Sequence, residues 1–339
     1  MTAIVFDLGG TNLRCAVAGD SGELSSLSRE RTCDLISFDT PEAGWKQIVK
    51  AIVNFERAVA SAVPVDAPII VSFAGPVAAR SRILSAPTVA GSSLSLPDLR
   101  LQLAAVTRRR VHILNDVSAA AWHISRSLPV SRFMVVTVRS GIGSMIFDRQ
   151  HSSGVLDEPP YSGEIGHLVV DVGSNSPVCD CGGRGHLGAI SSGRGIERAA
   201  RRLAHADSEG FLASACVRRY EASSHTLNNE EHLIPAALEG DEWALKVIRG
   251  CSRPLARALL TVVLGVGLER VVIIGGFALS LGKEYLSIIN SEMAQIWDYS
   301  LLPYSDQLVS IWEADDEVCL RGAAFFAQQV AAVCDPKTL

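Results

Sequence analysis

The strongest chemical signal in the sequence is a pair of cysteines followed closely by a histidine. Cys179, Cys181 and His186 lie within eight residues, and His167 stands twelve residues before the first cysteine. Thiolate and imidazole are the ligands that Zn²⁺ prefers, and four of them can close a tetrahedral site. The alternative is a pair of free thiols in a flexible loop. A loop so rich in glycine needs a cross-link, such as a bound metal ion, to hold one conformation. We therefore expect one structural zinc on these four residues.

A glycine turn near the N-terminus is a second candidate for chemistry. It follows an apolar run and contains Asp7, Gly9, Gly10, Thr11 and Asn12. With the glycines at positive φ, the N–H groups of residues 10 to 12 can point at one spot, which suits a phosphate. The acid can hold Mg²⁺ through water, and the threonine hydroxyl can donate to a phosphate oxygen. The glycine pair alone is more typical of an ordinary hairpin, and its polar neighbours favour the phosphate site.

Two further glycine turns follow apolar runs later in the chain. One contains Ser140, Gly141 and Gly143, and the other ends in Gly275 and Gly276. Each is a weak signal by itself, because glycine turns are common in many classes of protein. The first of them lies between two apolar runs, as at the N-terminus. This indicates that the chain repeats its opening motif.

Polar residues at the end of an apolar strand supply candidate acid–base chemistry. Asn115 and Asp116 follow the run VHIL, which would place an amide and a carboxylate at a sheet edge beside a cleft. Helix capping is an alternative for Asp116, because a helix-forming segment follows it, and both roles can hold at once. Glu164 and His167 stand beside glycines, where a site residue and a solvated loop residue look alike.

The elements that must position these residues alternate between strands and helices, which predicts an α/β fold. Apolar side chains between 45 and 59 recur with helical spacing, whereas the runs before Gly75 and Asn115 are short and continuously apolar. The expected elements are strands in the first thirty residues, a helix at 45–59, a strand at 68–75, a helix at 97–106, a strand at 111–116, strand–turn–strand at 133–147, helices over 195–265, a strand at 270–276 and a helix at 278–297.

The composition of the chain excludes several classes of protein. The 339 residues carry 31 Lys plus Arg against 36 Asp plus Glu, a net charge of -5, and their length suggests two domains. This balance excludes a nucleic-acid-binding surface, and no run approaches the ~18 apolar residues of a membrane span. The N-terminus lacks the features of a signal peptide, and six of the eight cysteines are scattered. We therefore expect a soluble cytosolic protein with no disulfide framework and no membrane or nucleic-acid partner.

In this order the motifs resemble the ROK family of sugar kinases and sugar-responsive repressors, which have the hexokinase and actin-like fold. The resemblance covers nearly the whole chain, and the ordered set is strong although each part is weak. The segments that carry it are DLGGTNLR (7–14), SFAGPV (72–77), ILND (113–116), SGIGS (140–144), GEIGH (163–167), CDCGGRGH (179–186) and VVIIGGFA (271–278).

The resemblance implies a function for each motif. Asp116 matches the catalytic base, residues matching Asn115, Glu164 and His167 hydrogen-bond sugar hydroxyls, and the turn at Gly75 lies in the substrate site. The same histidine belongs to a zinc site, and the glycine turns bind ATP with Mg²⁺. It further implies two domains with a cleft between them, 1–116 plus about 315–339 and 117–314, with a C-terminal helix at 318–330 packed on the first. We also expect a homodimer.

Several positions depart from the family pattern. His186 replaces a third cysteine, and Gly188 replaces a glutamate that touches the sugar near its anomeric end. Ala74 occupies the position of a family proline, Thr88 that of an asparagine and Ser140 that of a threonine. The catalytic elements therefore match the family better than the sugar pocket does.

These features predict an ATP-dependent kinase for a hydroxyl of a sugar or sugar-like polyol. The altered pocket favours a cyclitol or an amino sugar, and an ordinary glucokinase is the alternative. A sugar-sensing repressor would need a DNA-binding domain before Asp7, for which we expect no room. A degenerate binding protein that has lost catalysis is the other rival. A nicotinamide enzyme is poorly supported, because no GxGxxG with a downstream acid follows the first strand.

Overall fold

The computed structural model describes residues 2–32, 40–86, 97–313 and 317–333, and its contacts divide the chain into two compact units. Unit 1 consists of Met1–Pro129, Met145–Ser162 and Ala314–Leu339, and unit 2 consists of Val130–Ser144 and Gly163–Glu313. This division differs from the expected boundary at residue 116. The helix that begins there packs within unit 1, against the C-terminal helix.

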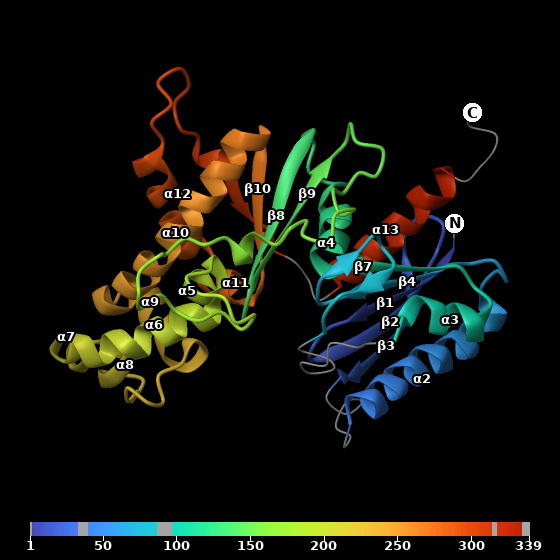
Figure 1. Cartoon of the computed structure of the whole chain (residues 1–339), viewed down its shortest axis with the longest axis horizontal. Helices are drawn as coiled ribbons and strands as arrows, with labels where there is room; N and C mark the ends of the chain where they lie inside the picture. The colour runs from blue at the N-terminus through green and yellow to red at the C-terminus, as the bar shows by residue number, and fades with distance from the viewer. Residues whose placement is uncertain (1, 33–39, 87–96, 314–316, 334–339) are drawn as a thin grey trace. The chain divides into compact units, whose positions relative to one another are not determined.

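A five-stranded sheet forms the centre of unit 1 (Figure 1). Its first three strands are antiparallel neighbours, as the strand–turn–strand pattern predicts, and two further strands continue the sheet in parallel. Every residue of the first strand is buried. The strand order is β3 (Leu24–Arg31), β2 (Asn12–Ala18), β1 (Ala3–Leu8), β4 (Ile69–Phe73) and β7 (Val111–Asn115).

Helices cover both faces of this sheet. Successive side chains of a strand point to opposite faces, and the apolar side chains on each face are buried. Ile4, Phe6 and Leu8 pack into an apolar cluster with α2 and α3. Ala3 and Val5 are equally buried on the opposite face, where α13 packs against β1 and α4. The remaining elements of unit 1 are α2 (Pro41–Val59), η1 (Ala60–Ala62), β5 (Val77–Ala78), β6 (Arg82–Ile83), α3 (Leu99–Thr107), α4 (Asp116–Ile124) and α13 (Val318–Val333).

Close contact between α13 and α4 depends on a glycine. A Cβ atom at Gly322 would lie 1.7 Å from the carbonyl oxygen of Ala119, which no side chain could tolerate. The helix that carries Asp116 is therefore held directly against the C-terminal helix. The side chain of Cys319 also lies 3.6 Å from the Asp116 carbonyl oxygen, which accepts its S–H.

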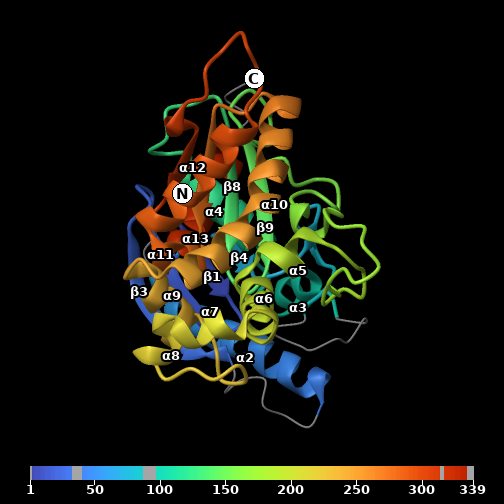
Figure 2. The same cartoon turned by 90° about the vertical axis from the view of Figure 1, so that its left-hand side faces the viewer.

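A second sheet has four strands in the order β11 (Val309–Ile311), β10 (Arg270–Ile274), β8 (Arg132–Val138) and β9 (Ile142–Asp148), with β10 parallel to both β8 and β11. Its strands belong to unit 2 except for residues 145–148 of β9, which are part of unit 1. The long helix α10 lies beside α12 (Figure 2). The helical elements of unit 2 are η2 (Ile165–His167), α5 (Leu187–Ser191), α6 (Gly193–Ala206), α7 (Ser208–Ala213), α8 (Ala215–Arg218), η3 (Asn229–Leu233), α9 (Ile234–Leu238), α10 (Glu242–Val266), α11 (Gly276–Leu281), α12 (Lys283–Ile296) and η4 (Asp306–Leu308).

The single helix expected at 278–297 is wrong. Gly282 adopts φ 53° and ψ −122°, which is not a helical conformation, so α11 ends before it and α12 begins after it. A glycine inside a helical pattern is compatible with an unbroken helix at modest cost, and the sequence pattern therefore does not reveal this break. In the described part of the chain, no helix combines the length and apolar character that crossing a membrane requires.

Candidate functional site

The carboxylate expected to do acid–base chemistry stands at the start of α4, directly after β7. Asn115, and not Asp116, is the helix cap, because its Oδ1 accepts the N–H groups of Val117 (2.9 Å) and Ser118 (3.3 Å). Asp116 follows in the first turn, where its Oδ1 accepts the N–H of Val117 at 2.9 Å. The helix start is thus secured by the neighbouring residue, and the capping alternative does not by itself account for an acid at position 116.

The Asn115 amide also connects two strand ends. Its Nδ2 donates to the Gly75 carbonyl at 2.9 Å and to Asp116 Oδ1 at 3.2 Å. A Cβ atom at Gly75 would lie 2.8 Å from both the Phe73 ring and the Ser85 carbonyl oxygen, so this turn accommodates only glycine without a shift. Unit 1 therefore brings together three predicted substrate residues, at 75, 115 and 116.

Asp7 is a second carboxylate near this strand end. It is buried, its Oδ2 accepts from Arg14 Nη1 at 3.0 Å, and its Oδ1 accepts from Ser72 at 3.1 Å. Burial raises the pKa of Asp7, the charge of Asp116 raises it further, and Arg14 and Ser72 oppose this rise. Two carboxylates close enough to repel each other are a setting that a divalent cation stabilises.

The first glycine turn joins β1 to β2. Gly9 donates its N–H to the Asn12 carbonyl at 3.0 Å, and Gly10 and Thr11 are exposed at the tip. The expected positive φ is wrong, since neither glycine adopts it. The Asn12 side chain is buried and accepts from Arg29 Nε at 2.9 Å. Arg29 therefore places a cation beside the turn, which the sequence motifs did not indicate.

Three glycine segments meet at the end of β8 in unit 2. The N–H of Arg139 donates to the Gly141 carbonyl at 3.0 Å, and the N–H of Gly193 donates to the Arg139 carbonyl at 2.7 Å. Gly275 has φ 105°, and a Cβ atom there would lie 2.7 Å from the Val138 carbonyl oxygen. The structure thus joins the second and third predicted turns and adds the start of α6. The pattern SGRG at 192–195 was the available signal for this third segment.

The surface of this junction has little side-chain cover. Ser140 and Gly141 are exposed, and Gly143 is half-buried in β9. A Cβ atom at Gly141 or Gly276 would meet nothing within 4 Å. Such a surface lets a ligand approach the backbone closely, which is how glycine-rich segments accommodate phosphates and nucleotides.

The four predicted metal ligands form one cluster in unit 2. The ligand atoms of His167, Cys179, Cys181 and His186 all lie within 4.8 Å of one another. The two histidine Nδ1 atoms are 3.4 Å apart. Cys181 Sγ lies 3.3 Å from His186 Nδ1, and Cys179 Sγ lies 3.9 Å from His167 Nδ1. Zinc bond lengths give tetrahedral edges of about 3.4 Å between nitrogens and about 3.6 Å between nitrogen and sulfur. The donor set and its spacing therefore fit a tetrahedral Zn²⁺ ion.

Backbone contacts hold the loop that presents these ligands. Cys179 donates its N–H to the Gly183 carbonyl at 2.7 Å, and Gly182 donates back to the Cys179 carbonyl at 2.8 Å. A Cβ atom at Gly185, which has φ 67°, would lie 1.7 Å from the Asp171 carbonyl oxygen. Burial is the largest influence on the Cys179 thiol and raises its pKa; the Cys181 backbone N–H opposes this rise, and the Cys181 thiol adds to it. A cation that favours thiolates would offset this rise.

Glu164 and His167 lie at the two ends of η2, Glu164 as its N-cap residue and His167 as its last residue. The imidazole directs Nδ1 to the cluster, and its Nε2 lies 3.6 Å from a carboxylate oxygen of Glu164. Gly188 on α5 packs over the same element, and a Cβ atom there would lie 3.2 Å from the Gly166 carbonyl oxygen. Position 188 thus contributes close backbone packing and no side chain. Thr88, the other departure in the sugar pocket, lies outside the described residues.

Comparison with known proteins identifies the class of protein. The ROK family model matches residues 3–330, and the chain belongs to the ROK family. The predicted family and α/β fold class are therefore confirmed. A C(7)-cyclitol 7-kinase from Streptomyces hygroscopicus subsp. jinggangensis is 35% identical over 94% of this chain and 92% of that protein. An N-acetylmannosamine kinase from Escherichia coli is 29% identical over 87% of this chain and 89% of that protein.

Solved structures show the same fold. A ROK family glucokinase from Streptomyces griseus, in complex with glucose and AMPPNP, matches with a TM-score of 0.71 at 22% identity, over 97% of this chain and 100% of that chain. A ROK hexokinase from Thermus thermophilus matches with a TM-score of 0.72 at 23% identity, over 98% and 100%.

Proposed function

We propose that this ROK-family chain is an ATP-dependent kinase that phosphorylates a hydroxyl group of a C7 cyclitol. The observation that carries this proposal is the 35% identity to a C(7)-cyclitol 7-kinase over almost the full length of both proteins. The carboxylate at the end of β7 and the glycine junction at the end of β8 supply the chemistry that such a reaction needs.

Asp116 is proposed as the base that accepts the proton of the attacking hydroxyl. In phosphoryl transfer the transition state is loose, so the proton leaves late and correct positioning contributes most. The Asn115 amide donates hydrogen bonds to the Gly75 carbonyl and to the Asp116 carboxylate, and it accepts one from the N–H of Val117 at the helix N-terminus. Asn115 therefore holds this carboxylate in one orientation. When bound, ATP supplies the phosphoryl group, and Mg²⁺ offsets the charge of the phosphates.

The phosphate-binding elements are proposed to be the glycine turns. The exposed backbone at Gly10 and Thr11 would hold phosphate oxygens, with the Thr11 hydroxyl as a further donor. In unit 2 the turn at Ser140 and Gly141 would do the same, and Gly275 and Gly276 would admit the nucleotide. Asp7, already fixed by Arg14 and Ser72, would hold Mg²⁺ through water.

Gly188 supports a substrate other than glucose. A family glutamate at this position touches the sugar near its anomeric end, and here no side chain is present beyond the backbone. A lost charge-assisted hydrogen bond weakens a ligand that needs it by roughly 1.5–3 kcal/mol, or about ten- to a hundredfold. A cyclitol has a carbon in place of the ring oxygen and so has no anomeric hydroxyl to satisfy.

Substrate selectivity tests this proposal. We expect kcat/KM for a C7 cyclitol to exceed that for glucose by at least about tenfold, for the reason given at Gly188. The measurement compares glucose, N-acetylmannosamine, kanosamine and C7 cyclitols under the same MgATP concentration. Glucose ahead of every other compound by tenfold would refute the altered pocket. N-acetylmannosamine ahead of the cyclitols would support the second candidate, which the relatives at 29% identity favour.

We also propose that the Cys–His cluster holds one structural zinc. The ion would orient His167, which stands beside Glu164, and would not contact the transferred phosphate. Protein purified without added metal should contain about one zinc per chain by elemental analysis, as a single closed tetrahedral site requires. Cys181→Ser should lose most of this zinc, whereas Cys216→Ser, at a cysteine outside the cluster, should retain it. Full zinc content in Cys181→Ser would exclude this ligand set.

A further inference from the structure

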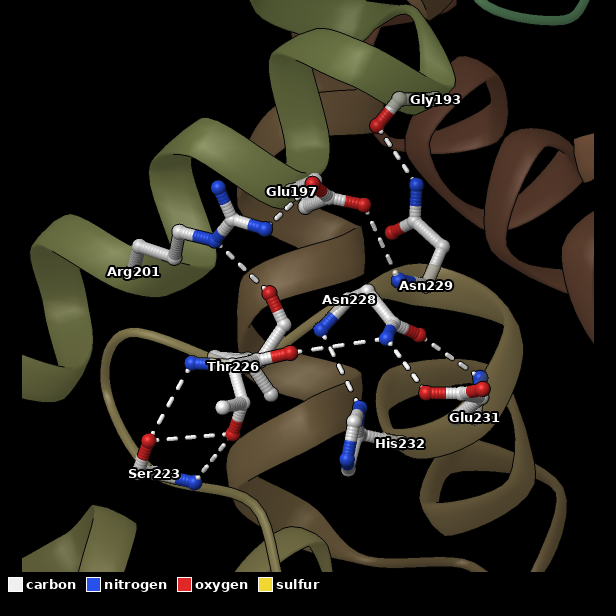
Figure 3. A network of polar contacts seen from close by, with 10 residues as sticks. Gly193, Glu197, Arg201, Ser223, Thr226, Asn228, Asn229, Glu231 and His232 are labelled. Atoms are coloured by element: carbon white, nitrogen blue, oxygen red, sulfur yellow. Dashed lines mark hydrogen bonds and ion pairs between the residues drawn. The ribbon is translucent and has the colours of Figure 1, made fainter.

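Asn229 lies at the centre of a polar network that joins α6 to the segment before α9 (Figure 3). Its Nδ2 donates to the Gly193 carbonyl at 2.7 Å, and its backbone N–H donates to Glu197 Oε2 at 3.2 Å. The other oxygen of Glu197 pairs with Arg201 at 2.8 Å, and Arg201 Nε donates to the Leu227 carbonyl at 2.7 Å. Successive turns of α6 therefore hold this segment in place.

Gly193 connects this network to the glycine turn after β8. The N–H of Gly193 donates to the Arg139 carbonyl at 2.7 Å, and the Gly193 carbonyl accepts from Asn229. Even a Cβ atom at Gly193 would lie only 3.0 Å from the Arg139 carbonyl oxygen. The first residue of α6 is thus bonded on one side to the turn and on the other side to the Asn229 amide.

The Asn229 side chain makes this contact at a cost. The Oδ1 atom of Asn229 is buried and has no hydrogen-bond partner among the described residues. The hydrogen bond that Nδ2 donates to the Gly193 carbonyl is therefore the contact that the side chain provides. Buried acceptors without a partner are rare in native proteins, and each calls for an explanation. Asn229 also begins η3, a single turn of π-helix, and such turns occur frequently at functional sites.

We infer that Asn229 is a positioning residue of the nucleotide site, which fixes the turn at Arg139–Gly141 by holding the Gly193 peptide. The inference rests on the proposed function, in which this turn binds the phosphates of ATP. Asn229 itself does not contact the nucleotide. Its loss therefore affects ATP binding through the position of the turn, and it leaves cyclitol binding and the chemical step unchanged.

The test replaces the amide with a group of the same shape that cannot donate. In Asn229→Asp a carboxylate oxygen would face the Gly193 carbonyl, where Nδ2 now donates at 2.7 Å. We expect the Kd of Mg–AMPPNP, measured by calorimetry, to rise about tenfold, with a smaller rise of about threefold in Asn229→Ala, which adds no repulsion. KM for ATP should follow the Kd, while kcat at saturating ATP and KM for the cyclitol stay within about twofold.

Asn228→Asp is the matched control, because it is the same change one residue away. Among the residues that the structure describes, the Asn228 side chain forms hydrogen bonds only within its own segment: it accepts from the Glu231 N–H and donates to the Glu231 carboxylate and the Thr226 carbonyl. This variant should bind Mg–AMPPNP as the wild type does. Equal losses in the two Asp variants, or wild-type binding in both Asn229 variants, would overturn the inference. If Asn229→Asp fails to fold, Asn229→Ala decides between these results. Failure of the wild type to bind Mg–AMPPNP would instead overturn the proposed function.

Discussion

Asp116→Asn is expected to lower kcat by about a hundredfold or more while the protein stays folded. Asparagine keeps the shape of the side chain and an oxygen that can accept the Val117 N–H, which Asp116 Oδ1 now accepts at 2.9 Å. The helix cap is on Asn115 and is unchanged. The variant therefore loses the proton acceptor and little else. Steady-state kinetics with saturating MgATP and the best substrate measure the effect.

Asp98→Asn provides a matched control for this change. Asp98 caps α3 in the same unit, and its Oδ1 accepts the Leu101 N–H at 2.9 Å, so the same carboxylate-to-amide replacement occurs at another helix start. Asparagine caps helices about as well as aspartate, and this control should keep both its kcat and its unfolding temperature. Near-normal kcat in Asp116→Asn would show that the base is a different residue.

Gly275→Ala is expected to destabilise unit 2 and to impair nucleotide binding. The residue has φ 105° and ψ 145°, a conformation that side-chain-bearing residues rarely adopt, and its Cβ atom would lie 2.7 Å from the Val138 carbonyl oxygen. Backbone strain and overpacking together cost about 3 kcal/mol. At 2–4 °C per kcal/mol for a unit of this size, the thermal midpoint should fall by about 6–12 °C. The affinity for Mg–AMPPNP should fall at least about tenfold as the end of β8 is displaced.

Gly276→Ala separates the backbone effect from a general intolerance of alanine at this turn. A Cβ atom at Gly276 would meet nothing within 4 Å, so the unfolding temperature of this variant should stay close to that of the wild type. Calorimetric scans of both variants make the comparison. Equal midpoints for Gly275→Ala and the wild type would contradict the packing described at the end of β8.

Elements with a local signal were predictable from the sequence. The strands of unit 1 are short apolar runs between turn residues, and α2 shows helical spacing from Trp45 onward. The apolar pattern begins four residues after the first residue of α2, because the cap on Thr40 and the first helical turn precede it. The break at Gly282 was missed since it depends on one backbone conformation, and periodicity carries no information about φ.

The candidate site divides in the same way. The Cys–His cluster was predictable because ligand types and short spacing are local properties, and the structure places those four residues together. The cap at Asn115 was not assigned, because two adjacent polar residues are equivalent in sequence and only geometry distinguishes them. The contact between Asn229 and Gly193 spans 36 residues, and the contact between Arg29 and Asn12 crosses a β-hairpin. No short motif encodes either of them.

Direct detection of the phosphorylated product tests the central claim most sharply. Purified, zinc-loaded protein is incubated with MgATP and a C7 cyclitol, and the products are followed by ³¹P NMR. The proposed function predicts a new phosphate monoester signal that grows in equal amount with ADP, with Asp116→Asn as the inactive control. ADP formed without a new monoester, or no turnover with any compound of the substrate panel, would contradict it.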